Sequence, residues 1–160
     1  MTDVVVRRFV PDDWAILREV RLAALLEAPY AFLSTYAEVS TWDESTWRSR
    51  PVNTAMFGGW IDGKPLGMVG LIPPAASDDP AGGSVLVAMW VAPDGRGRGL
   101  ADALIEAALG EAEAAGAASV VLEVAPGNDR AERVYRRHGF VPVDDTPHGP
   151  GDLVMRRTLA

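Results

Sequence analysis

The chain of 160 residues contains no cysteine. This excludes a disulfide framework, a thiolate metal site and a cysteine nucleophile. The two histidines, His138 and His148, are too few and too far apart in the sequence to indicate zinc, so we expect no metal. No apolar run approaches the roughly 18 residues that a membrane span requires, and the N-terminus lacks the order of a secretion signal. We therefore expect a cytoplasmic protein with no membrane partner.

Lysine is also nearly absent, with Lys64 as its single representative, and acidic residues outnumber basic ones by 22 to 15. The net charge of −7 argues against a nucleic-acid partner, because a surface that binds nucleic acid is basic. An acidic surface can attract a cationic amine, but it equally keeps an ordinary protein soluble, and both readings stay open. The length and the hydrophobic content of 48% predict one domain, residues 1–160, with a substantial core.

Apolar segments of two periodicities predict a sheet with interspersed helices. The expected strands are 4–9, 54–61, 64–72, 85–92, 119–124, 140–143 and 153–159. The expected helices are 11–28, 43–50, 99–115 and 128–138. Asp62-Gly63 is typical of a two-residue hairpin turn, and Thr41–Glu44 fits a capping box before the second helix. Residues 30–40 are interpreted as irregular, and the whole order predicts an α/β fold of three layers.

The segment between the strand at 85–92 and the helix at 99–115 is the most informative part of the chain. Strand, glycine-rich turn and helix N-terminus together form a typical phosphate-binding arrangement, because the N–H groups of the first helical turn have no partner. The sequence Gly99-Leu-Ala lacks the Gly-Lys-Ser/Thr of a nucleotide hydrolase. Its alternating glycines also miss the dinucleotide fingerprint G-x-G-x-x-G. A simple helix-start turn with solvated arginines remains the alternative.

Two blocks in this half of the chain resemble the GNAT superfamily of N-acetyltransferases. Arg96-Gly-Arg-Gly-Leu-Ala101 matches that family's acyl-CoA loop in full. Leu122–Asn128 followed by Ala131–Phe140 resembles its strand–Asn–helix–Tyr–Gly-Phe segment. The resemblance implies a mixed, mostly antiparallel twisted sheet of about seven strands flanked by about four helices. It also implies that strands four and five splay apart.

The resemblance implies that acetyl-CoA is the co-substrate. Backbone N–H groups around Arg96–Ala101 are then expected to contact its pyrophosphate, and the Val91 N–H its pantetheine arm or thioester oxygen. Trp90 lies beside that arm or is a core aromatic, and Asn128 caps its helix, contacts the arm, or does both. The expected cofactor-binding residues are Trp90, Val91, Arg96, Gly97, Arg98, Gly99, Leu100, Ala101, Asn128 and Tyr135.

The resemblance also implies two catalytic residues. Tyr135 is the expected acid for the leaving thiolate, because a phenol with a reference pKa near 10 is protonated at neutral pH; a core tyrosine is the alternative. Glu123 is the expected base, because the strand at 85–92 lacks the acid that many family members carry there. A solvated charge at the sheet rim explains Glu123 equally well. Asp94, Glu38 and a chain of waters also remain open as routes for the proton.

The acceptor is the least determined part of the reaction. Phe32, Tyr36 and His148 are candidates for its site, although the two aromatics also suit a core and His148 a bare surface. The absence of a thiol nucleophile favours direct attack by a primary amine in a ternary complex. We expect a small-molecule amine, with a peptide N-terminus, a protein lysine or a non-catalytic acyl-CoA sensor as alternatives. The resemblance also leaves a homodimer open.

Overall fold

A computed structural model describes residues 3–159 of the chain and arranges seven strands in one sheet. The strands are β1 (Val4–Arg8), β2 (Ala55–Ile61), β3 (Lys64–Ile72), β4 (Ser84–Val91), β5 (Ser119–Val124), β6 (Val141–Pro142) and β7 (Leu153–Thr158). Their order across the sheet is β1-β2-β3-β4-β5-β7-β6. All neighbours are antiparallel except β4 and β5, which are parallel. This is the mixed, mostly antiparallel sheet that the family resemblance implies.

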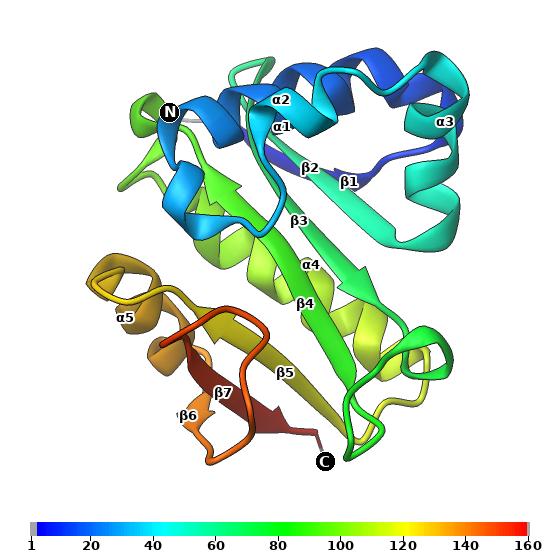
Figure 1. The fold of residues 1–160 in the computed structure, drawn as a ribbon. Helices are drawn as coiled ribbons and strands as arrows, with labels where there is room; N and C mark the ends of the chain where they lie inside the picture. The colour runs from blue at the N-terminus through cyan, green and yellow to red at the C-terminus, as the bar shows by residue number, and fades with distance from the viewer. Residues whose placement is uncertain (1–2, 160) are drawn as a thin grey trace.

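Helices cover both faces of the sheet (Figure 1). They are α1 (Trp14–Glu27), α2 (Tyr36–Val39), α3 (Glu44–Asn53), α4 (Leu100–Ala114) and α5 (Asp129–Arg137). The core on one face lies under α4 and α5 and contains Leu104 and Phe140, each at most 1% exposed. The core on the other face lies under α1 and α3 and is centred on Trp47 and Leu17. The expected three layers are therefore present.

Local sequence signals explain the hairpin and the close seating of α4. Asp62 and Gly63 both have positive φ, as a tight turn between antiparallel strands requires. A Cβ at Gly59 would lie 2.5 Å from Leu100 Cδ1, so the glycine lets the first turn of α4 rest directly on the sheet. The N-terminus of α4 is thereby fixed beside the end of β4.

The structure differs from the predictions mainly before β2. A short helix, α2, lies within 30–40, which were interpreted as irregular, because Thr35 caps it by accepting a hydrogen bond from the Glu38 N–H. The predicted capping box at Thr41–Glu44 is wrong. Asp43 is the cap, with its carboxylate 2.9 Å from the Thr46 nitrogen, and the helix runs three residues beyond the expected end.

Strands β4 and β5 separate after a short paired segment, and this opening positions the site. They pair only at Ser84 with Val120 and at Val85 with Val121. The remainder of β4, through Val91, has no partner on that edge, so its backbone groups there face an opening.

A bulge lies within the unpaired part of β4. Met68 pairs with Trp90 and Gly70 with Val87, so two residues of β4, Ala88 and Met89, stand opposite one residue of β3. Ala88 has a φ of 55°, which is rare for a residue with a side chain and indicates a conformation that the surrounding fold imposes.

No helix in the described part of the chain is long and apolar enough to cross a membrane.

Candidate active site

Two cavities flank the β4–β5 opening. The first, here called the loop cavity, has a volume of about 520 Å³ and is lined by the 95–101 loop, β4, the end of β5 and α5. Eight of the ten residues predicted to bind the cofactor line it. They are Trp90, Val91, Arg96, Gly97, Gly99, Ala101, Asn128 and Tyr135.

The loop at the start of α4 presents a row of free donors. The N–H groups of residues 97–102 have no acceptor within the described chain, and no side chain caps the helix. Gly97 and Gly99 have φ values of 73° and 85°, and a Cβ built at either would meet no atom within 4 Å. Open space therefore lies against bare backbone at the positive end of a helix dipole, which suits a phosphate.

The two arginine side chains of this loop are held by protein groups. Arg96 donates from Nε to the Val91 carbonyl at 3.1 Å and forms an ion pair with Glu27 at the end of α1. Arg98 reaches the hairpin carboxylate of Asp62 at 3.3 Å and does not line the cavity. The Leu100 side chain is 1% exposed in the core, so only its N–H is free for a ligand.

Trp90 packs in the core, whereas the backbone of Val91 faces the opening between β4 and β5. The Trp90 indole packs in the core under α1 and donates to Glu27 at 3.2 Å, so it has the core role as well as a place in the cavity wall. The Ala92 N–H donates to Leu66 on β3 at 2.7 Å. Because neighbouring residues of a strand alternate between its edges, the Val91 N–H faces away from β3, toward the opening.

Asn128 and Tyr135 lie on α5, two turns apart. The Asn128 side chain accepts from the Ala131 N–H at 3.4 Å, which confirms the helix cap, and both side chains line the loop cavity. Tyr135 is 6% exposed and packs edge-to-face on Phe140. Burial raises the pKa of the Tyr135 phenol, so it stays protonated across the neutral range.

The second cavity, here called the arginine cavity, has a volume of about 610 Å³ and lies on the α1 side of β4. It contains Arg21 of α1 and Arg50 of α3 at one end and the loop before β7 at the other. The two cavities share wall residues, including Ala88 of the bulge and Glu123 of β5. A group in either cavity can therefore meet a group from the other beside Glu123.

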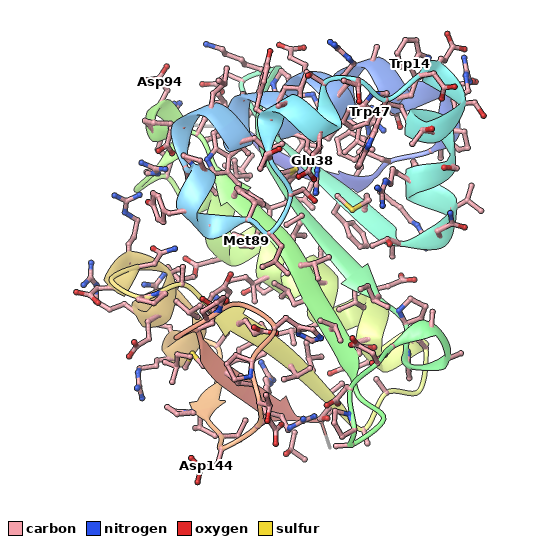
Figure 2. The ribbon with its side chains drawn as sticks, viewed as in Figure 1. Trp14, Glu38, Trp47, Met89, Asp94 and Asp144 are labelled. Carbon is pink, nitrogen blue, oxygen red and sulfur yellow. The ribbon has the colours of Figure 1, made fainter. Side chains whose placement is uncertain are left out.

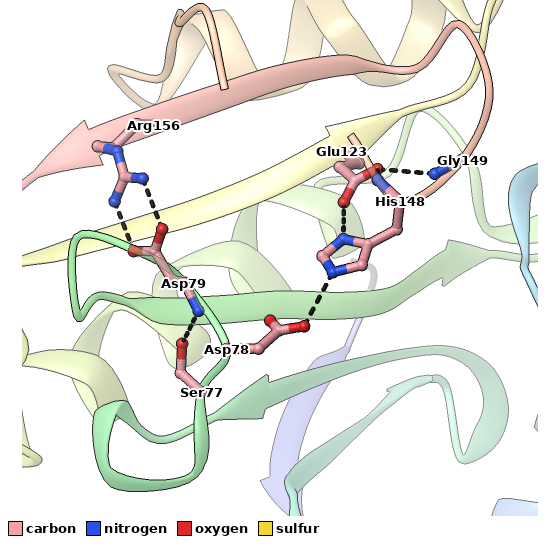
Figure 3. A network of polar contacts seen from close by, with 7 residues as sticks. All are labelled: Ser77, Asp78, Asp79, Glu123, His148, Gly149 and Arg156. Atoms are coloured by element: carbon pink, nitrogen blue, oxygen red, sulfur yellow. Dashed lines mark hydrogen bonds and ion pairs between the residues drawn. The ribbon is translucent and has the colours of Figure 1, made fainter. Parts of the chain in front are cut away.

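Glu123 is held in a polar network at this junction (Figure 3). Its carboxylate accepts the N–H groups of His148 at 2.7 Å and Gly149 at 3.2 Å, and it also contacts Nδ1 of the His148 ring. Nε2 of the ring lies 2.8 Å from Asp78. The hydrogen bond to Glu123, and then that to Asp78, raises the pKa of His148. His148 therefore lies in the polar network at the junction, and the loop before β7, which carries it, contacts the Glu123 carboxylate.

Asp152 adds a second carboxyl group beside Glu123. Burial, and then the charge of Glu123, raises the pKa of Asp152. Both residues line the arginine cavity. The junction is therefore the acidic end of that cavity, and its carboxylates suit a bound ammonium group.

The other candidates from the sequence are not brought to this junction. Figure 2 shows Glu38 on α2 and Asp94 in the turn after β4. Both residues are exposed, and neither lines either cavity. Phe32 lines the arginine cavity, whereas Tyr36 is 40% exposed and lies outside both.

Three charged residues of the site carry no sequence motif. Glu27 joins the end of α1 to Trp90 and Arg96. Arg21 and Arg50 lie in the arginine cavity, where burial, and then the charge of Arg50, lowers the pKa of Arg21 to about 10. The helical periodicity of the sequence does not predict that these residues belong to the site. A polar residue on a mostly buried helix face can be recognised as a site residue only once the position of the neighbouring helix is known.

Within residues 3–159 no group of three or more metal-ligating side chains is close enough together to hold an ion.

Comparison with known proteins places this geometry in a family. The model of the Acetyltransferase (GNAT) family matches residues 19–140. No curated protein resembles the sequence closely enough to count as a relative.

Solved structures share the fold at low sequence identity. The PaiA N-acetyltransferase of Thermoplasma acidophilum, solved with coenzyme A, has a TM-score of 0.71 at 17% identity, over 98% of this chain and 99% of that one. The ribosomal-protein-alanine N-acetyltransferase of Brucella melitensis gives 0.74 at 16%, over 97% and 99%. The putative acetyltransferase yncA of Salmonella typhimurium, solved with acetyl-CoA, gives 0.73 at 17%, over 99% and 95%. With its family model over residues 19–140 and its splayed strands β4 and β5, the chain belongs to the GNAT family of acetyl-CoA-dependent N-acetyltransferases.

Proposed function

We propose that this protein transfers an acetyl group from acetyl-CoA directly to the primary amine of a small molecule. The observation that carries the proposal is the meeting of the loop cavity and the arginine cavity at Glu123. Two substrates held in adjoining cavities can react without a covalent enzyme intermediate. Fixing both partners in this way supplies much of the rate acceleration.

The loop cavity fits the phosphate and pantetheine parts of acetyl-CoA. The free N–H groups of residues 97–102 suit the pyrophosphate, and the unpaired edge of β4 offers backbone groups to a peptide-like arm. The Val91 N–H and the side-chain amide of Asn128 are further donors along this path. Acetyl-CoA, when bound, supplies an acetyl thioester whose carbonyl carbon accepts the amine nitrogen.

Glu123 acts as the base in this proposal. A primary amine is protonated at neutral pH and must lose a proton before it can attack. Glu123 takes that proton, directly or through one water, while His148 and the Gly149 N–H hold its carboxylate in place. Because the His148 side chain is 55% exposed and contacts the more exposed Asp78, the network offers a route for the proton to solvent.

Tyr135 acts as the acid. As the new C–N bond forms and the C–S bond breaks, the sulfur takes the bonding electron pair and needs a proton. The Tyr135 phenol lines the loop cavity and stays protonated because burial raises its pKa, so it can donate that proton. The phenolate that results is returned to the neutral form by a proton from solvent.

A thiol-release assay with acetyl-CoA and a broad panel of amines tests the proposal. The panel contains small amines, peptides with free N-termini and a lysine side chain, so it also separates the alternative peptide and lysine acceptors. We expect release of free coenzyme A with small amines, and a rise in melting temperature with acetyl-CoA but not with ATP. Binding of acetyl-CoA without turnover on any amine would instead identify a non-catalytic sensor.

A further inference from the structure

The arginine end of the second cavity has positive charge that the protein does not neutralise. Neither Arg21 nor Arg50 has a carboxylate within 4.0 Å among residues 3–159, although acidic residues outnumber basic ones in the chain. Arg21 Nε is buried and has no hydrogen-bond partner. Each guanidinium group lies over an aromatic ring, Arg21 at 5.9 Å from the centre of the Phe32 ring and Arg50 at 4.0 Å from that of Trp42.

A further hydrogen-bond donor without an acceptor lies at the arginine end of the cavity. Trp47 also lines the cavity, and its indole nitrogen is buried without an acceptor. A buried donor without a partner is costly, and two neighbouring guanidinium groups repel one another. An anion between the two guanidinium groups would neutralise both charges, and their planar forks match the two oxygens of a carboxylate.

The cavity is polarised from one end to the other. Arg21 and Arg50 come from α1 and α3, which pack over β2 and β3, whereas Glu123 lies on β5 across the opening. His148 and Asp152 belong to the loop that covers the β5 side. The cationic end therefore lies away from the loop cavity, and the acidic end lies beside it.

We propose that Arg21 and Arg50 bind an anionic group of the acceptor, so that the acceptor is a small amine bearing a carboxylate, as in a free amino acid. The carboxylate occupies the arginine end, and its ammonium group points to Glu123 and the loop cavity. This inference rests on the proposed function, because it names the acceptor of the same reaction. A volume of about 610 Å³ suits a small molecule.

The test compares matched acceptors in the thiol-release assay. Each free amino acid is assayed beside its carboxamide and its decarboxylated amine, with the wild type and with Arg21→Met and Arg50→Met. Arg18→Met is the matched control, because Arg18 lies one turn earlier on α1 and lines neither cavity. Arg21→Lys is a milder variant that keeps the charge and loses the planar fork.

We expect the wild type to favour the free acid over its carboxamide by at least about tenfold in kcat/KM, mainly through KM, as a charged pair of hydrogen bonds would give. Arg21→Met and Arg50→Met should bring this ratio toward one, Arg21→Lys should leave an intermediate ratio, and Arg18→Met should keep it. Equal use of acid and carboxamide by the wild type would overturn the inference. So would an unchanged ratio in the two methionine variants, or a preference for peptides.

A binding measurement keeps the inference separable from the proposed function. Trp47 lines the cavity and Trp42 stacks on Arg50, so indole fluorescence can report on this end. We expect free amino acids to change the emission of the wild type, and their carboxamides to do so only at much higher concentration. If no amine is acetylated, the proposed function fails while this titration still decides the inference. If acids and carboxamides bind alike, the inference fails alone.

Discussion

Arg156 and Asp79 form a two-point ion pair, with both nitrogen–oxygen distances at 2.7 Å, that ties the loop before β4 to the last strand. Asp79 is 2% exposed in its side chain and also accepts the Gly83 N–H at 2.8 Å. Its neighbour Asp78 is thereby held against His148 (Figure 3). The pair thus supports the network around the proposed base without contacting the base itself.

Asp79→Asn should destabilise the protein by about 2–4 kcal/mol at pH 7, because it leaves the Arg156 guanidinium without its buried partner. Urea unfolding measures the change. Asp145→Asn is the matched control, since Asp145 contacts the same guanidinium but is 43% exposed. We expect that control to lose less than about 1 kcal/mol.

The same pair gives a pH dependence. The hydrogen bonds from Arg156 lower the pKa of Asp79 from 3.8 to about 2. Because the folded pKa is below the unfolded one, the stabilisation is present above about pH 4 and is lost as the pH falls to 2, roughly 2 kcal/mol in all. The unfolding free energy of Asp79→Asn should fall less over this range than that of the wild type. If the unfolding free energies of the wild type and of Asp79→Asn fell equally with pH, the pH dependence would not come from Asp79.

Gly99→Ala should weaken acetyl-CoA binding by at least about tenfold, because the added methyl group enters the open space against the loop where a phosphate needs bare backbone. Gly116→Ala is a matched control. Both glycines have positive φ, 85° and 75°, and open space around a built Cβ, but Gly116 lies at the far end of α4. If both variants lose similar stability but only Gly99→Ala binds acetyl-CoA more weakly, the loop at 95–101 is the binding site for the phosphates. If the two variants bind acetyl-CoA with equal affinity, that assignment is wrong.

Tyr135→Phe should lower kcat at least tenfold while the affinity for acetyl-CoA changes little, because the ring still packs on Phe140 and only the proton donor is lost. Steady-state kinetics and equilibrium binding separate the two effects. A fall in kcat of less than about threefold would mean that Tyr135 is not the principal acid.

Glu123→Gln should lower kcat/KM by about a hundredfold at pH 7. The difference in kcat/KM between the wild type and Glu123→Gln should become smaller as the pH rises, because more of the acceptor amine is then neutral without help from a base. Glu38→Gln, outside both cavities, should follow the wild-type pH profile. If Glu123→Gln ran parallel to the wild type at every pH, a chain of waters would be the better route for the proton.

His148→Gln should alter the pH dependence of stability. Its two carboxylate partners raise the folded pKa of His148 above its unfolded value of 6.5. The stabilisation is therefore fully present below about pH 6.5 and is lost as the pH rises through the folded pKa. The difference in unfolding free energy between wild type and His148→Gln should be largest at acidic pH and decrease with added salt. A constant difference across pH would show that the ring is not charged in this network.

The sequence predicted most of the fold because its strongest signals are local. Asp62-Gly63, the glycines of the loop at 95–101 and the cap at Asn128 each fix backbone geometry from neighbouring residues alone. The predicted helix boundaries were wrong where tertiary packing determines where a helix begins or ends. The helix α3 continues through Pro51, and α2 forms within a segment that has no clear periodicity.

Most of the predicted cofactor-binding residues line the loop cavity, whereas few of the residues that line the arginine cavity, Phe32 and His148 among them, were predicted. The loop and α5 are contiguous motifs, whereas Arg21, Asp78 and Asp152 come from three distant segments that meet only in the folded chain. His148 was a candidate for the acceptor site, but its contacts with Glu123 and Asp78 were not predicted, because these partners lie 25 and 70 positions away. The arginine pairs of the loop were also unforeseen, since Glu27 meets Arg96 from the other face of the sheet.

The extra residue in β4 has a consequence for any attempt to redesign this strand. Leu86 and Val91 both belong to the core under α4, although residues five apart in a regular strand point to opposite faces. Removing Ala88 would restore an unbroken ladder with β3, and Trp90 would still stand opposite Met68 and Val91 opposite Gly67, each on its present face of the sheet. The deletion would instead change the wall that the two cavities share, because Ala88 lines both of them. A chain shortened by this one residue should therefore keep its core and lose activity in a protein that still folds.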